Sequence, residues 1–222
     1  MWKLGTPATN VRQSAITRVC VTIAVAACAA LGAHPANAFL ARPAIFAKLD
    51  VVAKAPNGWL RFCADQPKEC RPTPDSSDDL QLTPEKLQQL YVINAHVNDR
   101  VKYTTDKALY GETERWAMPF DRGDCEDIVL LKRRLLSEAG WPAGALLVTV
   151  VQGRAGDVDR HAVLTVRTDR GEMILDNLTP EILFWYETSY RYLLRQSSRD
   201  PNVWLAFSMS QPRPEQISSA RP

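Results

Sequence analysis

The order of hydrophobic patterns along the chain predicts an α+β fold, in which helices come before an antiparallel sheet. Residues 83–102 and 128–139 repeat hydrophobic side chains at helical spacing. Three shorter runs follow, rich in β-branched residues and separated by turn residues: 145–151, 160–167 and 172–176. This change of period predicts one domain with its helices first and its sheet second.

The composition is that of a globular protein and excludes several other classes. The 222 residues are 45% hydrophobic and 23% charged, with only 10 Gly and no internal repeat, unlike disordered, collagen-like or repeat proteins. A formal net charge of +2 is too small for the concentrated basic face of a nucleic-acid-binding protein, so no nucleic-acid partner is expected.

Residues 1–38 have the three parts of a secretory signal peptide. A basic stretch without acidic residues precedes the apolar run 19–32, and Ala36-Asn37-Ala38 forms an A-x-A cleavage pattern. The run of 14 residues is shorter than the roughly 20 residues that a membrane-spanning helix needs. We therefore expect a periplasmic protein with a nearly neutral mature chain. The alternative is a lipoprotein signal that would attach lipid to Cys28, but the apolar run continues past that residue.

Export would leave three cysteines in the mature chain. Cys63 and Cys70 lie seven residues apart in a loop-like stretch, which in an oxidising compartment favours a local disulfide. They belong to an N-terminal segment, residues 39–81, which ends in the turn-rich linker 71–79. Cys125 is then a lone thiol, either an inert buried cysteine or a nucleophile.

Cys125 lies at or just before the N-terminus of the second predicted helix. The first helix is expected to begin at Thr83-Pro84, with Thr as the N-cap, and the second to end at Gly140. Backbone N–H groups at a helix start favour a thiolate, whereas the acidic residues beside Cys125 disfavour it. A cation, either a metal ion or an imidazolium, is therefore expected near this thiol.

A histidine and an aspartate are expected to meet on the sheet. Asp169-Arg170 predicts a hairpin turn, around which the numbers of paired residues sum to 339. His161 would then face Leu178, and Asp176 would lie one diagonal step away on the same face, within reach of the imidazole. His96, on the first helix, has no such partner and is expected at the surface or in helix packing.

The C-terminal third is predicted to contain another helix and two more packed segments. The helix is expected to open at Thr179-Pro180-Glu181, a strand is expected at 190–195, and 202–207 is apolar enough to pack. Residues 209–222 are expected to form a disordered tail. The compact domain is therefore placed at residues 82–208.

Three motifs, in this order, resemble those of the bacterial transglutaminase-like cysteine peptidases: Gly123-Asp-Cys-Glu-Asp127, His161-Ala-Val-Leu164 and Leu175-Asp-Asn-Leu178. Arg115-Trp-Ala-Met-Pro119 is similar to the Trp-Ala-x-Pro segment that precedes the family's cysteine. The resemblance covers residues 82–204. It implies a papain- or transglutaminase-like fold, with the catalytic cysteine at a helix N-terminus packed against an antiparallel sheet.

The resemblance also implies the roles of three residues. Cys125 would be the nucleophile, His161 the general base and then acid, and Asp176 the carboxylate that orients the imidazole. The reaction would be hydrolysis of a peptide bond in a protein substrate. The family includes the periplasmic protease that releases large biofilm adhesins from the cell surface, so an adhesin-type substrate and an inhibitory inner-membrane receptor are the partners it implies.

Adhesin-releasing members depend on calcium, and the resemblance implies a calcium site here. Asp124, Glu126 and Asp127 would supply hard oxygen ligands. The alternative is that these carboxylates only complement the helix dipole.

Two other functions stay open. One is transfer of the acyl group to an amine, as in transglutaminases, and the other is a catalytically silent calcium-dependent binding module. The Cys63–Cys70 loop and the linker 71–79 are not features that we associate with the adhesin protease, and they indicate a related subgroup whose substrate could differ.

Overall fold

The computed structural model describes residues 45–72, 80–153 and 160–209, all within one compact unit, Leu40–Pro222. The predicted signal peptide, most of the 71–79 linker and nearly all of the predicted tail lie outside these residues. The strands are β1 (Leu49–Ala53), β2 (Lys102–Tyr103), β3 (Arg122–Gly123), β4 (Leu146–Gln152), β5 (His161–Thr168), β6 (Gly171–Leu175), β7 (Leu183–Phe184), β8 (Arg191–Gln196) and β9 (Trp204–Phe207). The α-helices are α1 (Asn57–Asp65), α2 (Pro84–Arg100), α3 (Asp106–Tyr110) and α4 (Cys125–Glu138), with single 3₁₀ turns at Pro67–Cys70, Ala143–Ala145 and Trp185–Glu187.

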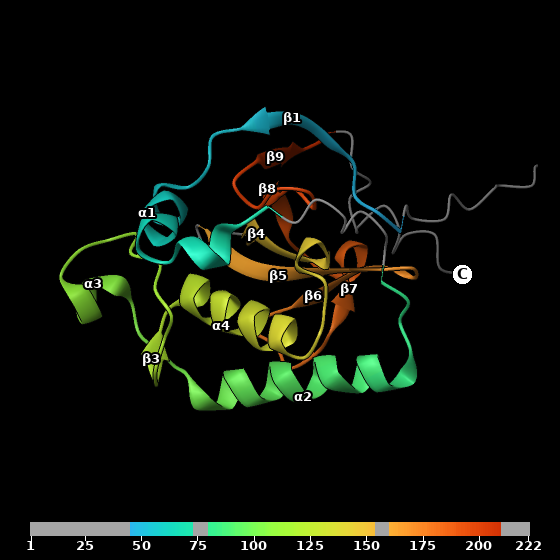
Figure 1. Ribbon diagram of the computed structural model, residues 1–222, viewed down its shortest axis with the longest axis horizontal. Coiled ribbons are helices and arrows are strands. Elements are labelled where there is room, and N and C mark those ends of the chain that lie inside the picture. The colour runs from blue at the N-terminus through green and yellow to red at the C-terminus, as the bar shows by residue number, and fades with distance from the viewer. Residues whose placement is uncertain (1–44, 73–79, 154–159, 210–222) are drawn as a thin grey trace, which may run out of the picture. The chain divides into compact units, whose positions relative to one another are not determined.

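One antiparallel sheet organises the described residues, with its seven strands in the order β1-β9-β8-β4-β5-β6-β7. Helix α4 packs on β4 and β5, and α2 packs on α4 (Figure 1). Both faces of the sheet are covered: Leu164 of β5 belongs to the core shared with α4, while its neighbour Val163 packs with Trp185. This architecture confirms the predicted α+β class.

The two long helices begin and end close to where their sequence signals predict. Thr83 caps α2, because its hydroxyl accepts a hydrogen bond from the Lys86 N–H, and Pro84 is the first helical residue. Helix α4 begins at Cys125, which the sequence places at or just before the helix N-terminus. Gly140 follows its last turn with φ of 84°, a left-handed conformation that suits glycine.

Strands β5 and β6 form the predicted hairpin in the predicted register, with Leu164 opposite Leu175. The ladder stops at this pair, so the expected pairing of His161 with Leu178 does not form. The chain turns at Asp176, whose Oδ1 accepts a hydrogen bond from the Leu178 N–H at 3.0 Å. The turn ends strand pairing beyond Leu175, and the carboxylate stays near the start of β5.

The stretch around Cys63 and Cys70 is helical, so the expectation of a loop is wrong, although the two cysteines form the expected disulfide. Helix α1 has no side-chain cap, and its local signals are weak. It is stabilised by burial of Trp59, which is 0% exposed and packs against Trp116. Gly58 permits this contact, because a Cβ there would overlap the Trp116 ring.

No helix opens at Thr179-Pro180-Glu181, so this prediction is wrong. The Thr179 hydroxyl accepts a hydrogen bond from the Glu181 N–H in a local turn, and the chain then pairs with β6 as strand β7. Pairing with the open edge of β6 outweighs the local helix-start signal. The predicted strand at 190–195 is confirmed as β8, and the apolar segment 202–207 contains β9.

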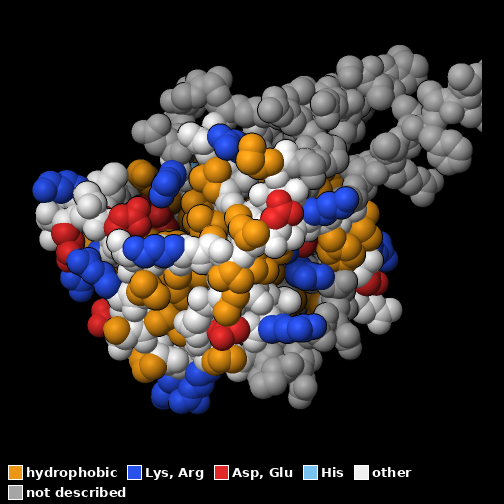
Figure 2. All heavy atoms as spheres, turned by 90° about the horizontal axis from the view of Figure 1, so that it is seen from above, with side chains coloured by type: hydrophobic (Ala, Val, Ile, Leu, Met, Phe, Trp, Pro, Cys, Tyr) orange, Lys and Arg blue, Asp and Glu red, His pale blue; other side chains and the backbone are white. Residues whose placement is uncertain are grey.

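The surface carries charged side chains of both signs. On the face shown in Figure 2, the described Lys and Arg side chains are scattered among hydrophobic and uncharged ones and form no continuous stripe. Within 45–72, 80–153 and 160–209, no helix is both long enough and apolar enough to cross a membrane.

A buried ion pair joins β6 to β8, and its loss is expected to be costly. Arg195 Nη1 lies 2.6 Å from Glu172 Oε1, and these side chains are 2% and 1% exposed. Arg195→Met should lower the free energy of unfolding by about 3–5 kcal/mol, because the Glu172 carboxylate would stay buried without its counter-charge. Denaturant unfolding measures this loss.

The matched control for this prediction is the double variant Arg195→Met/Glu172→Gln. The amide keeps an acceptor for the Ala47 N–H, which lies 3.1 Å from Glu172 Oε2, and leaves no buried charge. It should recover most of the lost stability. A loss below about 1 kcal/mol in the single variant, the range of exposed pairs, would contradict the prediction.

Candidate active site

Cys125 is the first residue of α4, and only 8% of it is exposed. Asp124 precedes it in an extended conformation and makes no side-chain cap, so the free N–H groups of the helix start lie at the cysteine. Cys125 is the free cysteine of the described residues. Its Sγ donates a hydrogen bond to Glu126 Oε2 at 2.9 Å.

The surroundings of Cys125 favour the neutral thiol. Burial raises the pKa of Cys125, and the charge and the hydrogen bond of Glu126 raise it further. The Ala162 N–H hydrogen-bonds the sulfur and lowers the pKa, which also places the sulfur beside the start of β5, next to His161. A positive charge is needed to offset the carboxylates if the thiolate is to form.

His161 and Asp176 form a buried pair at the end of the β5–β6 hairpin. His161 Nε2 lies 2.7 Å from Asp176 Oδ1, and the side chains are 3% and 2% exposed. Burial acts to raise the pKa of Asp176, but the hydrogen bond and charge of His161, with the Leu178 N–H and the Tyr190 hydroxyl, lower it overall. Because the carboxylate is ionised and only accepts, Nε2 carries the proton in this bond.

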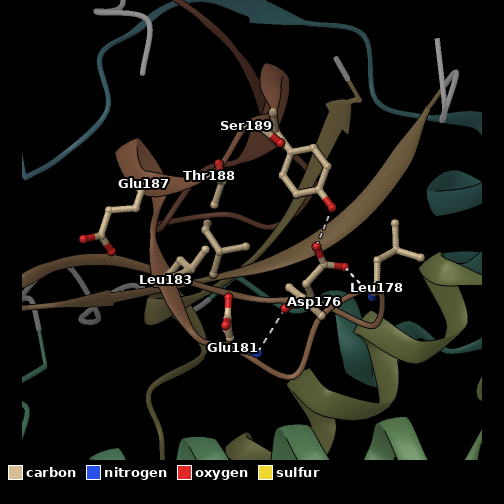
Figure 3. Close-up of a pocket in the computed structure, with 10 residues that line it drawn as sticks. Asp176, Leu178, Glu181, Leu183, Glu187, Thr188 and Ser189 are labelled. Atoms are coloured by element: carbon tan, nitrogen blue, oxygen red, sulfur yellow. Dashed lines mark hydrogen bonds between the residues drawn. The ribbon is translucent and has the colours of Figure 1, made fainter. Parts of the chain in front are cut away.

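Tyr190 completes the surroundings of Asp176. Its hydroxyl donates to Asp176 Oδ2 at 2.6 Å, the bond drawn in Figure 3, and its ring centroid lies 5.7 Å from that of His161. Burial and then the hydrogen bond to Asp176 raise the pKa of Tyr190, so its hydroxyl stays protonated as a donor. No local sequence signal relates Tyr190 to Asp176, since β7 and a 3₁₀ turn lie between them in the chain.

A cavity of about 340 Å³ opens beside Asp176 (Figure 3). Asp176 and Tyr190 form part of its wall, and Glu181, Leu183 and Ser189 line other parts. The cavity therefore adjoins Asp176, whereas neither His161 nor Cys125 is among the residues that line it.

Three aspartates near Cys125 form a cluster that could hold a cation. One carboxylate oxygen from each of Asp106, Asp124 and Asp127 lies within 4.8 Å of the others. Asp106 Oδ2 accepts a hydrogen bond from the Arg115 N–H at 2.5 Å, and Asp127 Oδ1 accepts one from the Ala117 N–H at 2.7 Å. These two bonds hold the segment that precedes the helix against the cluster.

The remaining oxygens of the cluster fit a divalent cation. Asp106 Oδ1, Asp124 Oδ1 and Asp127 Oδ2 are buried and have no hydrogen-bond partner among the described residues. Burial, and then the charges of neighbouring acidic residues, raise the pKa of Asp124 to about 9, and burial raises that of Asp127 to about 7. Calcium binds carboxylate oxygens, and these oxygens have no other partner among the described residues.

The cluster differs from the predicted ligand set by one residue. Glu126 is not part of it, because successive helical residues point about 100° apart, and Glu126 is turned toward the Cys125 sulfur. Asp106 takes its place. Parallel pairing of β2 with β3 brings the start of α3 beside Asp124, and no local pattern in the sequence indicates this pairing.

Two other residues that the sequence patterns singled out lie away from the chemistry. His96 is exposed on α2, as expected. Trp116, in the segment that resembles the family's Trp-Ala-x-Pro motif, is 4% exposed and packs with Trp59 and Trp204 at centroid distances of 6.1 Å. It belongs to the hydrophobic core.

A buried cysteine at a helix N-terminus, next to a His–Asp pair on an antiparallel sheet, defines the class of papain- and transglutaminase-like thiol enzymes. The family model of the bacterial transglutaminase-like cysteine proteinases (BTLCP) matches residues 50–212. The chain therefore belongs to this family of cysteine peptidases.

Solved structures of Legionella pneumophila LapG are similar to the chain. The calcium-bound form is 24% identical with a TM-score of 0.47, and the match covers 63% of this chain and 81% of that chain. A second LapG structure is 27% identical with a TM-score of 0.46, covering 57% and 71%. The EGTA-treated form is 23% identical with a TM-score of 0.46, covering 63% and 80%. These likenesses are loose and assign no residue roles here. A comparison with curated proteins finds no match.

Proposed function

We propose that this cysteine peptidase hydrolyses peptide bonds with Cys125 as the nucleophile, His161 as the general base and acid, and Asp176 as the orienting carboxylate. The observation that carries the proposal is the buried 2.7 Å bond between His161 and Asp176, beside the helix start that bears the one free thiol of the described residues. Because His161 Nε2 is bound to the Asp176 carboxylate, His161 Nδ1 is the nitrogen that exchanges protons with the thiol and the substrate.

The reaction follows from these groups. His161 takes the thiol proton as Cys125 Sγ attacks the peptide carbonyl carbon, and it then gives that proton to the leaving amine as the C–N bond breaks. Water, deprotonated by His161, then attacks the thioester carbon, and the C–S bond breaks to free the acid. His161 returns the proton to the Cys125 sulfur. The Cys125 N–H, at the first position of α4, is available as one donor to the oxyanion. The cavity beside Asp176 has room for a substrate side chain.

A calcium ion is proposed as part of the working enzyme. Asp106, Asp124 and Asp127 would hold it, since their unpartnered oxygens converge within 4.8 Å. The ion would supply positive charge near Cys125 and balance the carboxylates that keep the thiol neutral. It would also tie α3 to the start of α4, because Asp106 and Asp127 come from different elements.

Location and partners are proposed from the sequence patterns. The signal-like residues 1–38 and the Cys63–Cys70 disulfide both fit a periplasmic enzyme. The resemblance to adhesin-releasing peptidases makes a cell-surface adhesin the first substrate to test, and an inhibitory inner-membrane receptor the first regulator.

Product analysis distinguishes hydrolysis from acyl transfer. Purified protein with calcium is incubated with a proteome-derived peptide library in oxygen-18 water, with and without added methylamine, and new termini are identified by mass spectrometry. Hydrolysis places oxygen-18 in each new carboxyl group even when methylamine is present. Methylamide termini as the main product would instead identify an acyl transferase. No new termini beyond those of a Cys125→Ala preparation would support the silent binding module.

A further inference from the structure

The main-chain carbonyl of Asp176 lies where strand pairing ends. Leu175 is the last residue of β6 paired with β5, and Asp176 begins the turn that follows. The Asp176 carbonyl therefore lies beyond the last residue pair between β6 and β5, and it lacks the strand-to-strand pairing of the residues before it. Asp176 is nevertheless buried, with 2% of the residue exposed, and a buried carbonyl needs a donor.

Two side chains from two different helices supply donors to this carbonyl. Lys132 Nζ of α4 donates to it at 2.9 Å, and Asn98 Nδ2 of α2 donates at 2.9 Å. The carboxylate of the same residue is bound separately, by His161, Leu178 and the Tyr190 hydroxyl. The helices therefore hold the backbone of Asp176 while the sheet and its loops hold the side chain.

Lys132 is an unusual residue to find in this place. It is 0% exposed and lies on α4 seven residues, or about two turns, after Cys125, and so on the same side of the helix. The described residues include no carboxylate within ion-pair distance of it. Burial lowers the pKa of Lys132 to about 7, although the charge of Asp176 acts to raise it. A Leu or Met would fill this space without the cost of burying an amine, so packing alone does not account for the lysine.

We propose that Lys132, assisted by Asn98, is a positioning residue, whose bond to the Asp176 carbonyl sets where the His161–Asp176 pair lies relative to the helix that carries Cys125. The inference rests on the proposed function of these three residues. Lys132 and Cys125 are on one rigid helix, so a bond from Lys132 to Asp176 fixes the distance between nucleophile and orienting carboxylate. Either protonation state of the amine can donate this bond.

The test compares the hydrogen-bonded state of His161 in wild type and in Lys132→Met, which keeps the aliphatic volume and removes the donor. The chain has three histidines, so a protein labelled with nitrogen-15 at histidine gives few ring signals, and His96→Ala helps to assign them. Wild type should show a low-field Nε2–H proton for His161. In Lys132→Met this proton should broaden or move upfield, and kcat on a library peptide should fall roughly ten- to hundredfold with KM nearly unchanged.

Two further variants separate positioning from general stability. Asn98→Ala removes the second donor to the same carbonyl and should change the His161 signal in the same direction, to a smaller extent. Thr165→Val removes a buried hydroxyl of β5 that lies 2.6 Å from the Thr149 hydroxyl of β4 and takes no part in the bonds to Asp176 described above. It should lower stability while leaving the His161 signal and kcat unchanged.

The outcomes separate this inference from the proposed function. An unchanged His161 signal and kcat in Lys132→Met, with only a lower melting temperature, would show a purely structural lysine. If Lys132→Met does not fold, Asn98→Ala decides by the same two readouts. If Cys125→Ala still cleaves peptides, the proposed function fails, whereas the resonance of His161 still reports whether Lys132 sets the position of Asp176.

Discussion

Replacement of Cys125 by alanine is expected to abolish peptide cleavage, with the rate falling by about a thousandfold or more, because no other group can form the thioester. The fold should persist, since the change removes only one buried sulfur atom. Cleavage of the peptide library measures the first effect, and circular dichroism with thermal unfolding measures the second. Undiminished cleavage by a clean Cys125→Ala preparation would overturn the assignment of the nucleophile.

The two histidines of the described residues provide a matched control for the general base. His161→Ala should reduce cleavage as severely as Cys125→Ala, because loss of the imidazole leaves both proton transfers without a carrier. His96→Ala removes an exposed imidazole from α2 and should leave cleavage unchanged. Equal activity of the two histidine variants would remove His161 from the mechanism.

Alkylation separates a peptidase from a silent binding module. In a mature chain that begins at residue 39, iodoacetamide should label Cys125, and the loss of activity should follow the labelled fraction, because Cys63 and Cys70 are joined in a disulfide. A binding module would instead have an unreactive Cys125, and its partner would bind the Cys125→Ala protein as well as wild type.

Removal of calcium is expected to reduce both stability and cleavage. An ion that binds only the folded protein contributes about 2.7 kcal/mol at a concentration one hundred times its Kd. Calcium should therefore raise the melting temperature, and EGTA should reverse this rise. Cleavage should fall at least about tenfold in EGTA, since each pKa unit by which the thiol is shifted changes the thiolate fraction about tenfold. Re-addition of calcium should restore both properties.

Variants of single carboxylates test which residues bind the ion. Asp106→Asn should weaken calcium binding in titration calorimetry by at least about tenfold, because it removes a charged ligand at nearly constant shape. Glu126→Gln should weaken binding less than Asp106→Asn does, since Glu126 contributes no oxygen to the cluster, although its charge lies close to Asp124. The reverse pattern, with Glu126 essential and Asp106 dispensable, would restore the ligand set expected from the sequence motif. A melting temperature that does not respond to calcium in wild type would remove the site.

Local patterns predict much of this fold because they report on neighbouring residues. The Thr83 cap and the hydrophobic period of α2 describe a helix that needs no distant partner to be recognised. The same holds for the hairpin, where the turn at Asp169-Arg170 fixes the register and brings His161 and Asp176 to one end of two adjacent strands. The prediction failed where a distant partner outweighs the local signal. Helix α1 exists because Trp59 is buried, and the segment after Thr179 is a strand because β6 offers an open edge.

The residues of the site fall into the same two groups: those that local sequence signals indicate, and those that only contacts between distant elements bring into place. Cys125, His161 and Asp176 can be inferred from the chain, because a helix start and a hairpin turn place them by short-range geometry. Asp106, Tyr190 and Lys132 carry no such signal, because each reaches its partner through contacts between elements: the β2–β3 pairing, the loop before β8 and the packing of α4 on the sheet. A contact between distant segments depends on the free energy of the whole packed core. It produces no periodic pattern of hydrophobic residues in the sequence near either partner. The sequence thus specifies which groups could do the chemistry. The packing of the tertiary structure decides which contacts hold these groups, which of them are charged, and how far apart they lie.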